Sequence, residues 1–337
     1  MPPGCVVRRA AATGFRRAAG RDPAQYSGGM SMRTRPSVSL LGAAVLATTA
    51  AVGGAPAHAA PAAPTYVALG DSYSSLPADA TVGASQQERA CGRSTHNYPK
   101  LVAASLGLAP DALRDNTCGG AQTRDAFARQ HAGSAKTGYY DAAPQLDGIT
   151  PATKLVTVSL GGNDSDLYSS ILESCAVAPR SAAIRCTSDE RTRPARLSDG
   201  AVASHLAQIT ASNERIIRAV RERSPHARVL LVGYPAIFAG DSTCAAIAPF
   251  RSASIPWMRS ILTERLNDAV QRAAVNARAE YVDMEAPSKG HELCSARPWI
   301  NGVNEVPRAA SLHPFPEEGE AVATAVTAAV RASGPRL

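Results

Sequence analysis

The stretch TYVALGDS, residues 65–72, indicates the fold class. Its first six residues are a short apolar run that follows Pro64 and ends at a Gly-Asp-Ser turn, which is the pattern of a buried strand. Similar runs recur as LVTVSL at 155–160, RVLLV at 228–232 and EYVDM at 280–284. The chain therefore predicts at least four buried strands.

Segments long enough to form helices separate these apolar runs. They cover residues 99–108, 198–222, 258–277 and 316–332. Near-continuous apolar strands that alternate with helices indicate an α/β fold whose parallel sheet is covered on both faces. In such sheets the functional loops follow the carboxyl ends of the strands, so we expect catalytic or binding residues there.

The composition is that of a globular protein: 45% of the 337 residues are hydrophobic, 5% are aromatic and 19% are charged. The formal charge of +7 is unevenly distributed, because residues 1–59 hold seven Arg and one Asp. Residues 60–337 carry 28 Lys plus Arg against 27 Asp plus Glu. Non-specific nucleic-acid binding rests on clustered cationic side chains, so we expect no nucleic-acid partner.

The N-terminal region reads as an export signal. Arg33 and Arg35 precede an uncharged stretch at 36–57, and Ala-His-Ala at 57–59 fits a signal-peptidase cleavage site. We therefore expect residues 1–59 to be a leader and signal peptide that is removed, and the mature protein to be secreted and extracellular.

The alternative, a membrane anchor, is disfavoured because the stretch is rich in Ala, Thr and Gly and is interrupted by Pro56. No Pro- or Ser-rich linker divides the remainder, so residues 60–337 are expected to form a single catalytic domain. We expect a monomer with no stable membrane anchor.

Residues 60–337 contain six cysteines, an even number that favours three disulfides in an oxidising compartment. The absence of a CxxC spacing argues against a zinc ribbon or a redox site. Fifteen pairings are open. The simplest is sequential, joining Cys91 with Cys118, Cys175 with Cys186, and Cys244 with Cys294.

Ser72 is the first candidate for chemistry, because a serine directly after a strand exposes its hydroxyl as a nucleophile requires. The tripeptide recurs at 240–242, but that copy lies beside Cys244 and reads as an ordinary loop. LGGND at 160–164 follows another strand, and the amide of Asn163 could donate a hydrogen bond to a developing oxyanion.

Two further stretches add candidates of the same kind. CGGAQT at 118–123 pairs glycines before an expected helix, so backbone N–H groups are exposed there. SLHP at 311–314 places His313 before the final helix, although a lone histidine is more often structural. The polar segment 165–197 has no clean period and is expected to be an excursion pinned by a local disulfide, either substrate-facing or a surface loop.

Taken in chain order, the four stretches resemble the sequence blocks of the SGNH, or GDSL, hydrolase superfamily, and most of all its secreted actinobacterial lipases and esterases. The resemblance covers residues 60–337 and implies a flavodoxin-like three-layer α/β/α fold with a central parallel sheet. It implies a carboxylic ester hydrolase with Ser72 as nucleophile and His313 as general base. The oxyanion hole would consist of the Ser72 N–H, the Gly120 N–H and the Asn163 side chain.

One departure concerns the histidine. Many relatives carry Asp three residues before it, whereas this chain has Ala310. The resemblance then implies a Ser-His dyad in which a main-chain carbonyl, of Ala310 or Ser311, accepts the other ring N–H of His313. A more distant acid, Glu317 or Glu318, stays open as the orienting group.

A second departure follows the nucleophile, where relatives often continue Ser-Gly and this chain has Ser75-Leu76-Pro77. We expect that bulk to reshape the mouth of the pocket. His291-Glu292 begins like a zinc-protease motif, but Ser295 stands where the second histidine should be, so no metal and no cofactor is expected.

The substrate class stays open between related chemistries. A lipase or esterase acting on acyl esters leads, and the few aromatic residues make a stacking platform for sugars less obvious. A phospholipase or a carbohydrate deacetylase would use the same site. The opposing class is a catalytically dead binding module that kept the fold.

Overall fold

The computed structural model describes residues 63–77, 85–175, 191, 193–240, 244–248, 250 and 252–332. The expected signal peptide, Cys186 and the second Asp-Ser pair at 241–242 lie outside the described residues.

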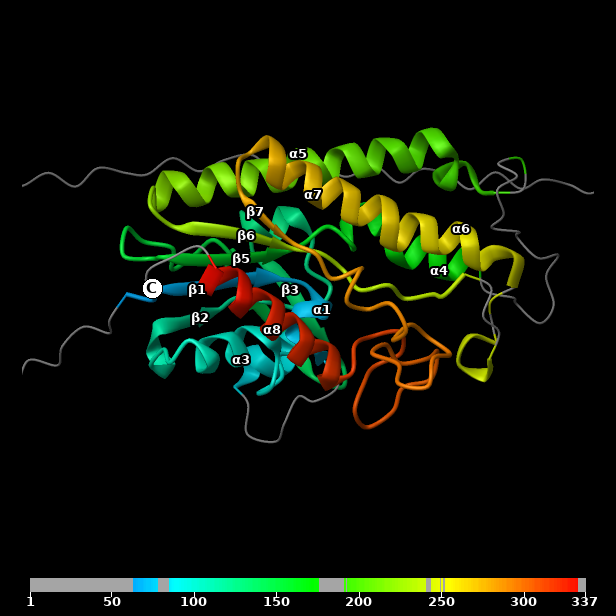
Figure 1. Ribbon diagram of the computed structural model, residues 1–337, viewed down its shortest axis with the longest axis horizontal. Coiled ribbons are helices and arrows are strands. Elements are labelled where there is room, and N and C mark those ends of the chain that lie inside the picture. Colours follow the sequence, from blue (N-terminus) through cyan, green and yellow to red (C-terminus); the bar gives the residue numbers. More distant parts are fainter. Residues whose placement is uncertain are drawn as a thin grey trace, which may run out of the picture. The chain divides into compact units, whose positions relative to one another are not determined.

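A five-stranded parallel sheet forms the centre, in the order β2-β1-β5-β6-β7 (Figure 1). The strands are β1 (Tyr66–Gly70), β2 (Leu113–Asp115), β5 (Leu155–Ser159), β6 (Arg228–Val232) and β7 (Glu280–Val282). β1 and β5 are neighbours, and Gly70 pairs with Ser159 at their carboxyl ends. The segments that follow these two strands therefore start side by side.

Helices cover both faces of the sheet (Figure 1), which confirms the expected three-layer α/β/α fold. Alternate residues of β1 point to opposite layers, as the two-residue period of a strand requires. Val67 and Leu69 belong to the core beneath α5 and α7, whereas Tyr66 and Ala68 belong to the core beneath α3 and α8. These helices are α3 (Tyr98–Ser105), α5 (Asp199–Arg223), α7 (Leu266–Asn276) and α8 (Pro316–Ala332).

Shorter elements connect these layers. The helices are α1 (Ser72–Ser75), α2 (Gln86–Cys91), α4 (Leu167–Cys175) and α6 (Ile255–Arg259), and an antiparallel hairpin joins β3 (Gln130–Ser134) to β4 (Gly138–Ala142). A π-helical segment, Ser260–Arg265, lies between α6 and α7. Single 3₁₀ turns cover Pro110–Ala112, Thr123–Ala126, Asp164–Asp166, Ala195–Leu197, Ala245–Ile247 and Ser252–Ser254.

The structure differs from the sequence expectations in three places. β2 and the hairpin were not predicted, since β2 has three residues and none of them is fully buried. The segment at 165–197 begins with the amphipathic helix α4 rather than an irregular loop. The helix expected at 258–277 already begins at Ile255 and contains the π-helical turn.

Two disulfides match the sequential pairing, Cys91 with Cys118 and Cys244 with Cys294. The pairing of Cys175 with Cys186 stays a prediction, because Cys186 lies outside the described residues. Within the described segments, no helix combines the length and the apolar character needed to cross a bilayer.

Candidate functional site

Ser72 begins the four-residue helix α1 directly after the fully buried strand β1. The preceding residue, Asp71, caps this helix by accepting a hydrogen bond from the backbone N–H of Tyr73 at 2.9 Å. The Asp71 N–H donates to the Ser159 carbonyl at 3.1 Å, which extends the pairing of β1 with β5 by one bond. Ser72 is therefore held at the carboxyl edge of the sheet, where the sequence placed it.

Asp71 also connects the turn that carries Ser72 to the turn after β5. Its second carboxylate oxygen accepts from the Tyr234 hydroxyl at 2.7 Å, and that hydroxyl accepts from the Gly162 N–H at 3.1 Å. Burial raises the pKa of Asp71 to about 7, while the hydrogen bonds from Tyr234 and Tyr73 act in the opposite direction. The Asp71–Tyr234–Gly162 chain fixes the distance between these two turns.

Hydrogen bonds also join the turn after β5 to the segment at 118–123. The Asn163 side chain donates to the Ala121 carbonyl at 3.1 Å, and an amide NH₂ has a second N–H that this bond leaves available. Asp164 accepts from the Thr123 N–H at 2.8 Å and from the Thr123 hydroxyl. Burial raises the pKa of Asp164, and these two Thr123 bonds partly offset that rise.

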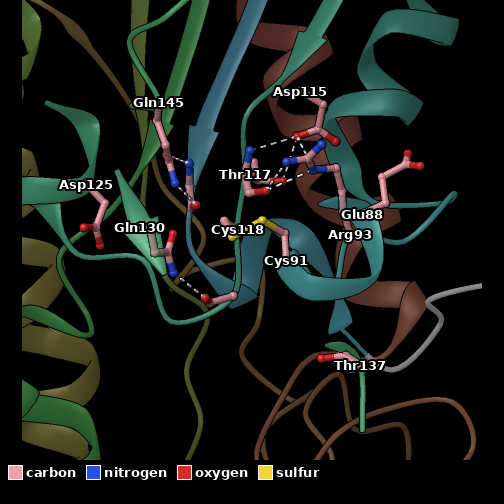
Figure 2. The surroundings of a disulfide bond; sticks show 12 residues. Glu88, Cys91, Arg93, Asp115, Thr117, Cys118, Asp125, Gln130, Thr137 and Gln145 are labelled. Carbon is pink, nitrogen blue, oxygen red and sulfur yellow. Dashed lines mark hydrogen bonds and ion pairs between the residues drawn. A yellow bond between two sulfur atoms is a disulfide. The ribbon is translucent and has the colours of Figure 1, made fainter. Parts of the chain in front are cut away.

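The turn at Gly119 and Gly120 is joined to neighbouring elements by the Cys91–Cys118 disulfide and by hydrogen bonds (Figure 2). The Cys118 N–H donates to the Gly70 carbonyl at 3.0 Å, and the Gly119 N–H donates to the Cys91 carbonyl at 2.8 Å. Gln130 donates to the Gly119 carbonyl at 2.8 Å. Gly120 has φ +72°, a left-handed conformation that costs glycine little.

His313 is oriented by a main-chain carbonyl. Its Nδ1 donates to the Ser311 carbonyl at 2.7 Å, one of the two carbonyls indicated by the sequence. A donating Nδ1–H leaves Nε2 as the atom able to accept a proton. Loss of water around the partly buried ring lowers the pKa of His313, and the Ser311 carbonyl partly counteracts this. The imidazole is therefore neutral at neutral pH.

The residue before the histidine is held by two tyrosines. The carbonyl of Leu312 accepts from the Tyr73 hydroxyl at 3.0 Å and from the Tyr168 hydroxyl at 3.2 Å, and the two hydroxyls are 2.8 Å apart. Leu312 has φ +57°, an uncommon conformation for a non-glycine residue. The ring centroids of Tyr73 and His313 lie 5.8 Å apart, so Tyr73 packs beside the imidazole while its hydroxyl fixes the backbone.

Neither acid that the sequence left open is hydrogen-bonded to the histidine. Glu317 accepts from Arg308 at 2.6 Å; partial burial acts to raise its pKa, but Arg308 lowers it below the usual value. Glu318 is 1% exposed, and its Oε2 makes no hydrogen bond among the described residues. Burial, reinforced by the charge of Asp71, raises the pKa of Glu318 to about 8.

One cavity of about 60 Å³ brings together side chains from three of the four sequence blocks, namely Ser72, Asn163 and His313. Gly120 is not among its lining residues and lies in the neighbouring turn, beside the carbonyl that Asn163 contacts. The other lining residues are Asp71, Tyr73, Gly162, Tyr168, Tyr234, Ile237, Leu262 and Leu266.

Leu76 does not reshape the mouth of this cavity as expected from the sequence. It is 1% exposed and is absent from the cavity wall. Leu76 adopts φ +60° at the end of α1, and its N–H donates to the Ser72 carbonyl at 3.0 Å. Its bulk enters the core, where a Cβ on Gly319 would lie 4.0 Å from it.

Sequence reasoning missed the tyrosines and the apolar wall. Tyr73 adjoins a recognised motif and could have been found from it, whereas Tyr234, Leu262 and Leu266 belong to segments whose only signal was apolar periodicity.

Among the described residues, no cluster of three or more His, Cys, Asp or Glu could hold a metal ion.

Known proteins are similar to this chain in sequence. The GDSL-like Lipase/Acylhydrolase family matches residues 68–317. "Lipase 2" of Streptomyces coelicolor is 38% identical over 271 residues, which cover 74% of this chain and 83% of that protein. "Lipase 1" of the same organism is 30% identical over 84% of this chain and 94% of its own length.

Solved structures agree on the architecture. The extracellular lipase from Streptomyces rimosus is 27% identical with a TM-score of 0.57, covering 80% of this chain and 99% of that one. Phospholipase A1 from Streptomyces albidoflavus, 24% identical with a TM-score of 0.58 and the same coverage, shares the fold. The family model matches most of this chain, and the matched region covers most of the length of both Streptomyces coelicolor lipases. This chain therefore belongs to the GDSL-like lipase/acylhydrolase family.

Proposed function

We propose that this protein is a secreted serine hydrolase of the lipase and esterase class, which cleaves carboxylic acyl esters through a Ser72–His313 dyad and an oxyanion hole. The observation that carries the proposal is the shared cavity. Ser72, Asn163 and a neutral, carbonyl-oriented His313 line one small space although they come from separate parts of the chain.

The first half-reaction is the acylation of the serine. His313 Nε2 takes the proton of Ser72 Oγ as that oxygen attacks the ester carbonyl carbon. The resulting imidazolium then gives this proton to the departing alcohol oxygen. In the second half-reaction His313 removes a proton from water, the water oxygen attacks the acyl-enzyme, and Ser72 regains its proton as the acid leaves.

Three donors would stabilise the negative oxygen in both tetrahedral intermediates. The Asn163 side chain has an N–H beyond the one used by Ala121, and the backbone N–H groups of Ser72 and Gly120 complete the set. Because Asn163 and Asp164 are bound to the 118–123 segment, the donors are positioned before substrate arrives. Such preorganisation contributes more to the rate than flexible donors would.

The dyad replaces a carboxylate with the carbonyl of Ser311. A carbonyl acceptor fixes the tautomer and the ring orientation, although it stabilises the imidazolium less than a carboxylate would. The lowered pKa of His313 is compatible with this arrangement, because a base with a lower pKa stays unprotonated down to a lower pH.

Export is supported by disulfides and by a relative. Cys91–Cys118 and Cys244–Cys294 form bonds that persist in oxidising compartments, and the Streptomyces rimosus lipase is described as extracellular. We therefore assign residues 1–59 as the removed leader and signal peptide and residues 60–337 as one catalytic domain.

The test is ester hydrolysis by the mature chain and two matched serine variants. Ser72→Ala should abolish hydrolysis of p-nitrophenyl acetate and butyrate, since the nucleophilic oxygen is gone. Ser75→Ala is the control, because Ser75 lies in the same helix and its buried Oγ makes no hydrogen bond among the described residues. It should retain the wild-type rate within about threefold.

Hydrolysis that survives Ser72→Ala would remove this serine from the nucleophile position. A mature chain that hydrolyses no ester and resists labelling by a fluorophosphonate would instead indicate the catalytically dead binding module.

A further inference from the structure

The cavity around Ser72 has an apolar wall as well as polar lining residues. This wall consists of Ile237, Leu262 and Leu266. Each of the three is only 1% exposed, so the wall belongs to the packed core and not to a surface loop. Packed core positions tolerate small changes in volume poorly, which makes such a wall a sharp limit on the size of a ligand.

A widened helical turn supplies Leu262. The π-helical segment Ser260–Arg265 joins α6 to α7, and π-turns inside longer helices occur frequently at functional sites. Three consecutive residues of this turn, Ile261, Leu262 and Thr263, are all at most 1% exposed. Leu262 thereby reaches the cavity together with Leu266, four residues further along.

The apolar wall of the cavity suits the acyl group of an ester and not the alcohol. The acyl group stays bonded to Ser72 between the two half-reactions, whereas the alcohol must leave and water must take its place beside His313. An apolar wall would trap a leaving group but can hold an acyl chain through the whole cycle. Burial of that chain against leucine side chains is favourable by the ordinary hydrophobic effect.

We propose that Ile237, Leu262 and Leu266 close an acyl pocket that limits the enzyme to short-chain esters. This inference rests on the proposed ester hydrolysis at Ser72. The cavity volume of about 60 Å³ corresponds to about four to six water-sized groups at roughly 10–15 Å³ each, so we expect chains of up to about six carbons to fit.

A second hollow shares no lining residue with the Ser72 cavity. That hollow of about 410 Å³ is lined by His291, Arg297, Pro298, Trp299, Arg308, Phe315 and Glu317, none of which lines the Ser72 cavity.

The first arm of the test is a chain-length profile of the wild-type mature protein. The p-nitrophenyl esters of acetate, butyrate, hexanoate and octanoate are compared at concentrations where each is monomeric. We expect kcat/KM to fall at least about tenfold from butyrate to octanoate, since a methylene group that does not fit a pocket changes the rate by about that factor. A matched series of acetate esters with alcohols of increasing length should show no such drop.

The second arm opens the wall. Leu262→Ala should raise the ratio of octanoate to butyrate kcat/KM at least about tenfold. Ile261→Ala is the matched control, because it truncates a buried neighbour in the same π-turn that does not line the cavity. Its ratio should equal that of the wild type. Should Leu262→Ala fail to fold, Leu262→Val gives the same comparison with a smaller shift.

The outcomes separate this inference from the proposed function. Ser72-dependent hydrolysis that peaks at octanoate would overturn the short-chain limit and leave the ester hydrolase intact. A length limit found only in the alcohol series would overturn the assignment of the wall to the acyl group. The absence of Ser72-dependent hydrolysis at every chain length would instead overturn the proposed function, and the inference with it.

Discussion

Ser72 and His313 reach the same cavity by different structural means. Ser72 follows β1, a strand with all five residues buried and with paired neighbours on both sides. His313 lies near the end of a segment from Asp283 to Phe315 in which the described backbone forms no helix and only isolated bridges. The Ser72 side is thus held by a regular ladder, and the histidine side by isolated backbone bonds and by bonds from side chains to the backbone.

Asn301 is the clearest example of such bonds on the histidine side. Its side-chain nitrogen lies 2.7 Å, 2.9 Å and 3.0 Å from the carbonyl oxygens of Asn304, Ala309 and Ala310. The backbone N–H of Asn301 donates to the His313 carbonyl at 2.9 Å. The comparison implies that single substitutions should disturb the two sides differently. Many backbone hydrogen bonds fix the position of a strand in the sheet, whereas a few hydrogen bonds fix the segment that carries His313.

The largest expected effect comes from the junction of the two sides, at Asn163. Asn163→Ala should lower kcat by about 10²- to 10³-fold, because one oxyanion donor is lost. Asn163→Asp keeps the size but replaces the NH₂ donor with an acceptor, and should cost at least as much. Steady-state kinetics with p-nitrophenyl butyrate measures both. A loss of less than threefold in either variant would remove Asn163 from the oxyanion hole.

A pair of amide variants tests the contrast between ladder and loop. Gln145 accepts from the Gly70 N–H at 2.8 Å and donates to the Gly70 carbonyl at 3.0 Å, so it supports the Ser72 side as Asn301 supports the histidine side. Both Gln145→Ala and Asn301→Ala should lower the free energy of unfolding by about 1–3 kcal/mol, because buried backbone groups lose their partners.

Only Asn301→Ala should also lower kcat, by about tenfold, since a small displacement of His313 is enough to misalign proton transfer. Urea unfolding and kinetics below the unfolding transition measure the two quantities separately. Equal losses of kcat in both variants would contradict the distinction between the sides.

Glu318 gives a pH-dependent effect on stability. Its pKa is about 8 in the folded chain and about 4.3 in an unfolded one, so between these values the folded state binds more protons. The free energy of unfolding must then fall as pH rises through this window, by at most about 1.4 kcal/mol per pH unit. Glu318→Gln removes this decline.

The stability gained by Glu318→Gln should therefore grow from pH 5 to pH 8 in urea unfolding. Glu317→Gln is the neighbouring control and should show no such growth, because the pKa of Glu317 is lowered. A gain from Glu318→Gln that stays constant with pH would contradict the burial of an uncompensated carboxyl group.

The smallest expected effect is on activity at Glu317. Glu317→Gln should leave kcat/KM within about twofold of wild type, since this acid pairs with Arg308 and not with His313. The acid limb of the pH profile should have its midpoint below about 6.5 in both proteins, because the His313 pKa is lowered and the neutral ring is the active form. A collapse of activity would reveal Glu317 as a third catalytic member.

The same contrast explains what the sequence could predict. The apolar runs and the motifs at their carboxyl ends are local signals, so the sheet, Ser72 and Asn163 could be placed from the sequence alone. β2 escaped because three half-exposed residues carry no period. For the histidine side, the sequence reached two candidate carbonyls, and the coordinates distinguish them: His313 Nδ1 donates to the Ser311 carbonyl.

The tertiary partners could not be predicted in this way. Tyr234 follows β6 and contacts Asp71 only because the two strands lie in one sheet. Leu262 lines the cavity through a π-turn, which has no distinct hydrophobic period. These contacts depend on the packing of distant segments and not on any local preference.

A double-mutant cycle on Ser72 and His313 tests the central claim most directly. The kcat/KM for p-nitrophenyl butyrate is measured for Ser72→Ala, His313→Ala and the double variant, with His291→Ala as a control whose Nδ1 also contacts a carbonyl, that of Arg297. If the two residues act as one unit, each single variant loses about 10⁴-fold or more and the double variant loses no more than either. A double variant whose loss equals the product of the two single losses would show that Ser72 and His313 act independently, and would contradict the account.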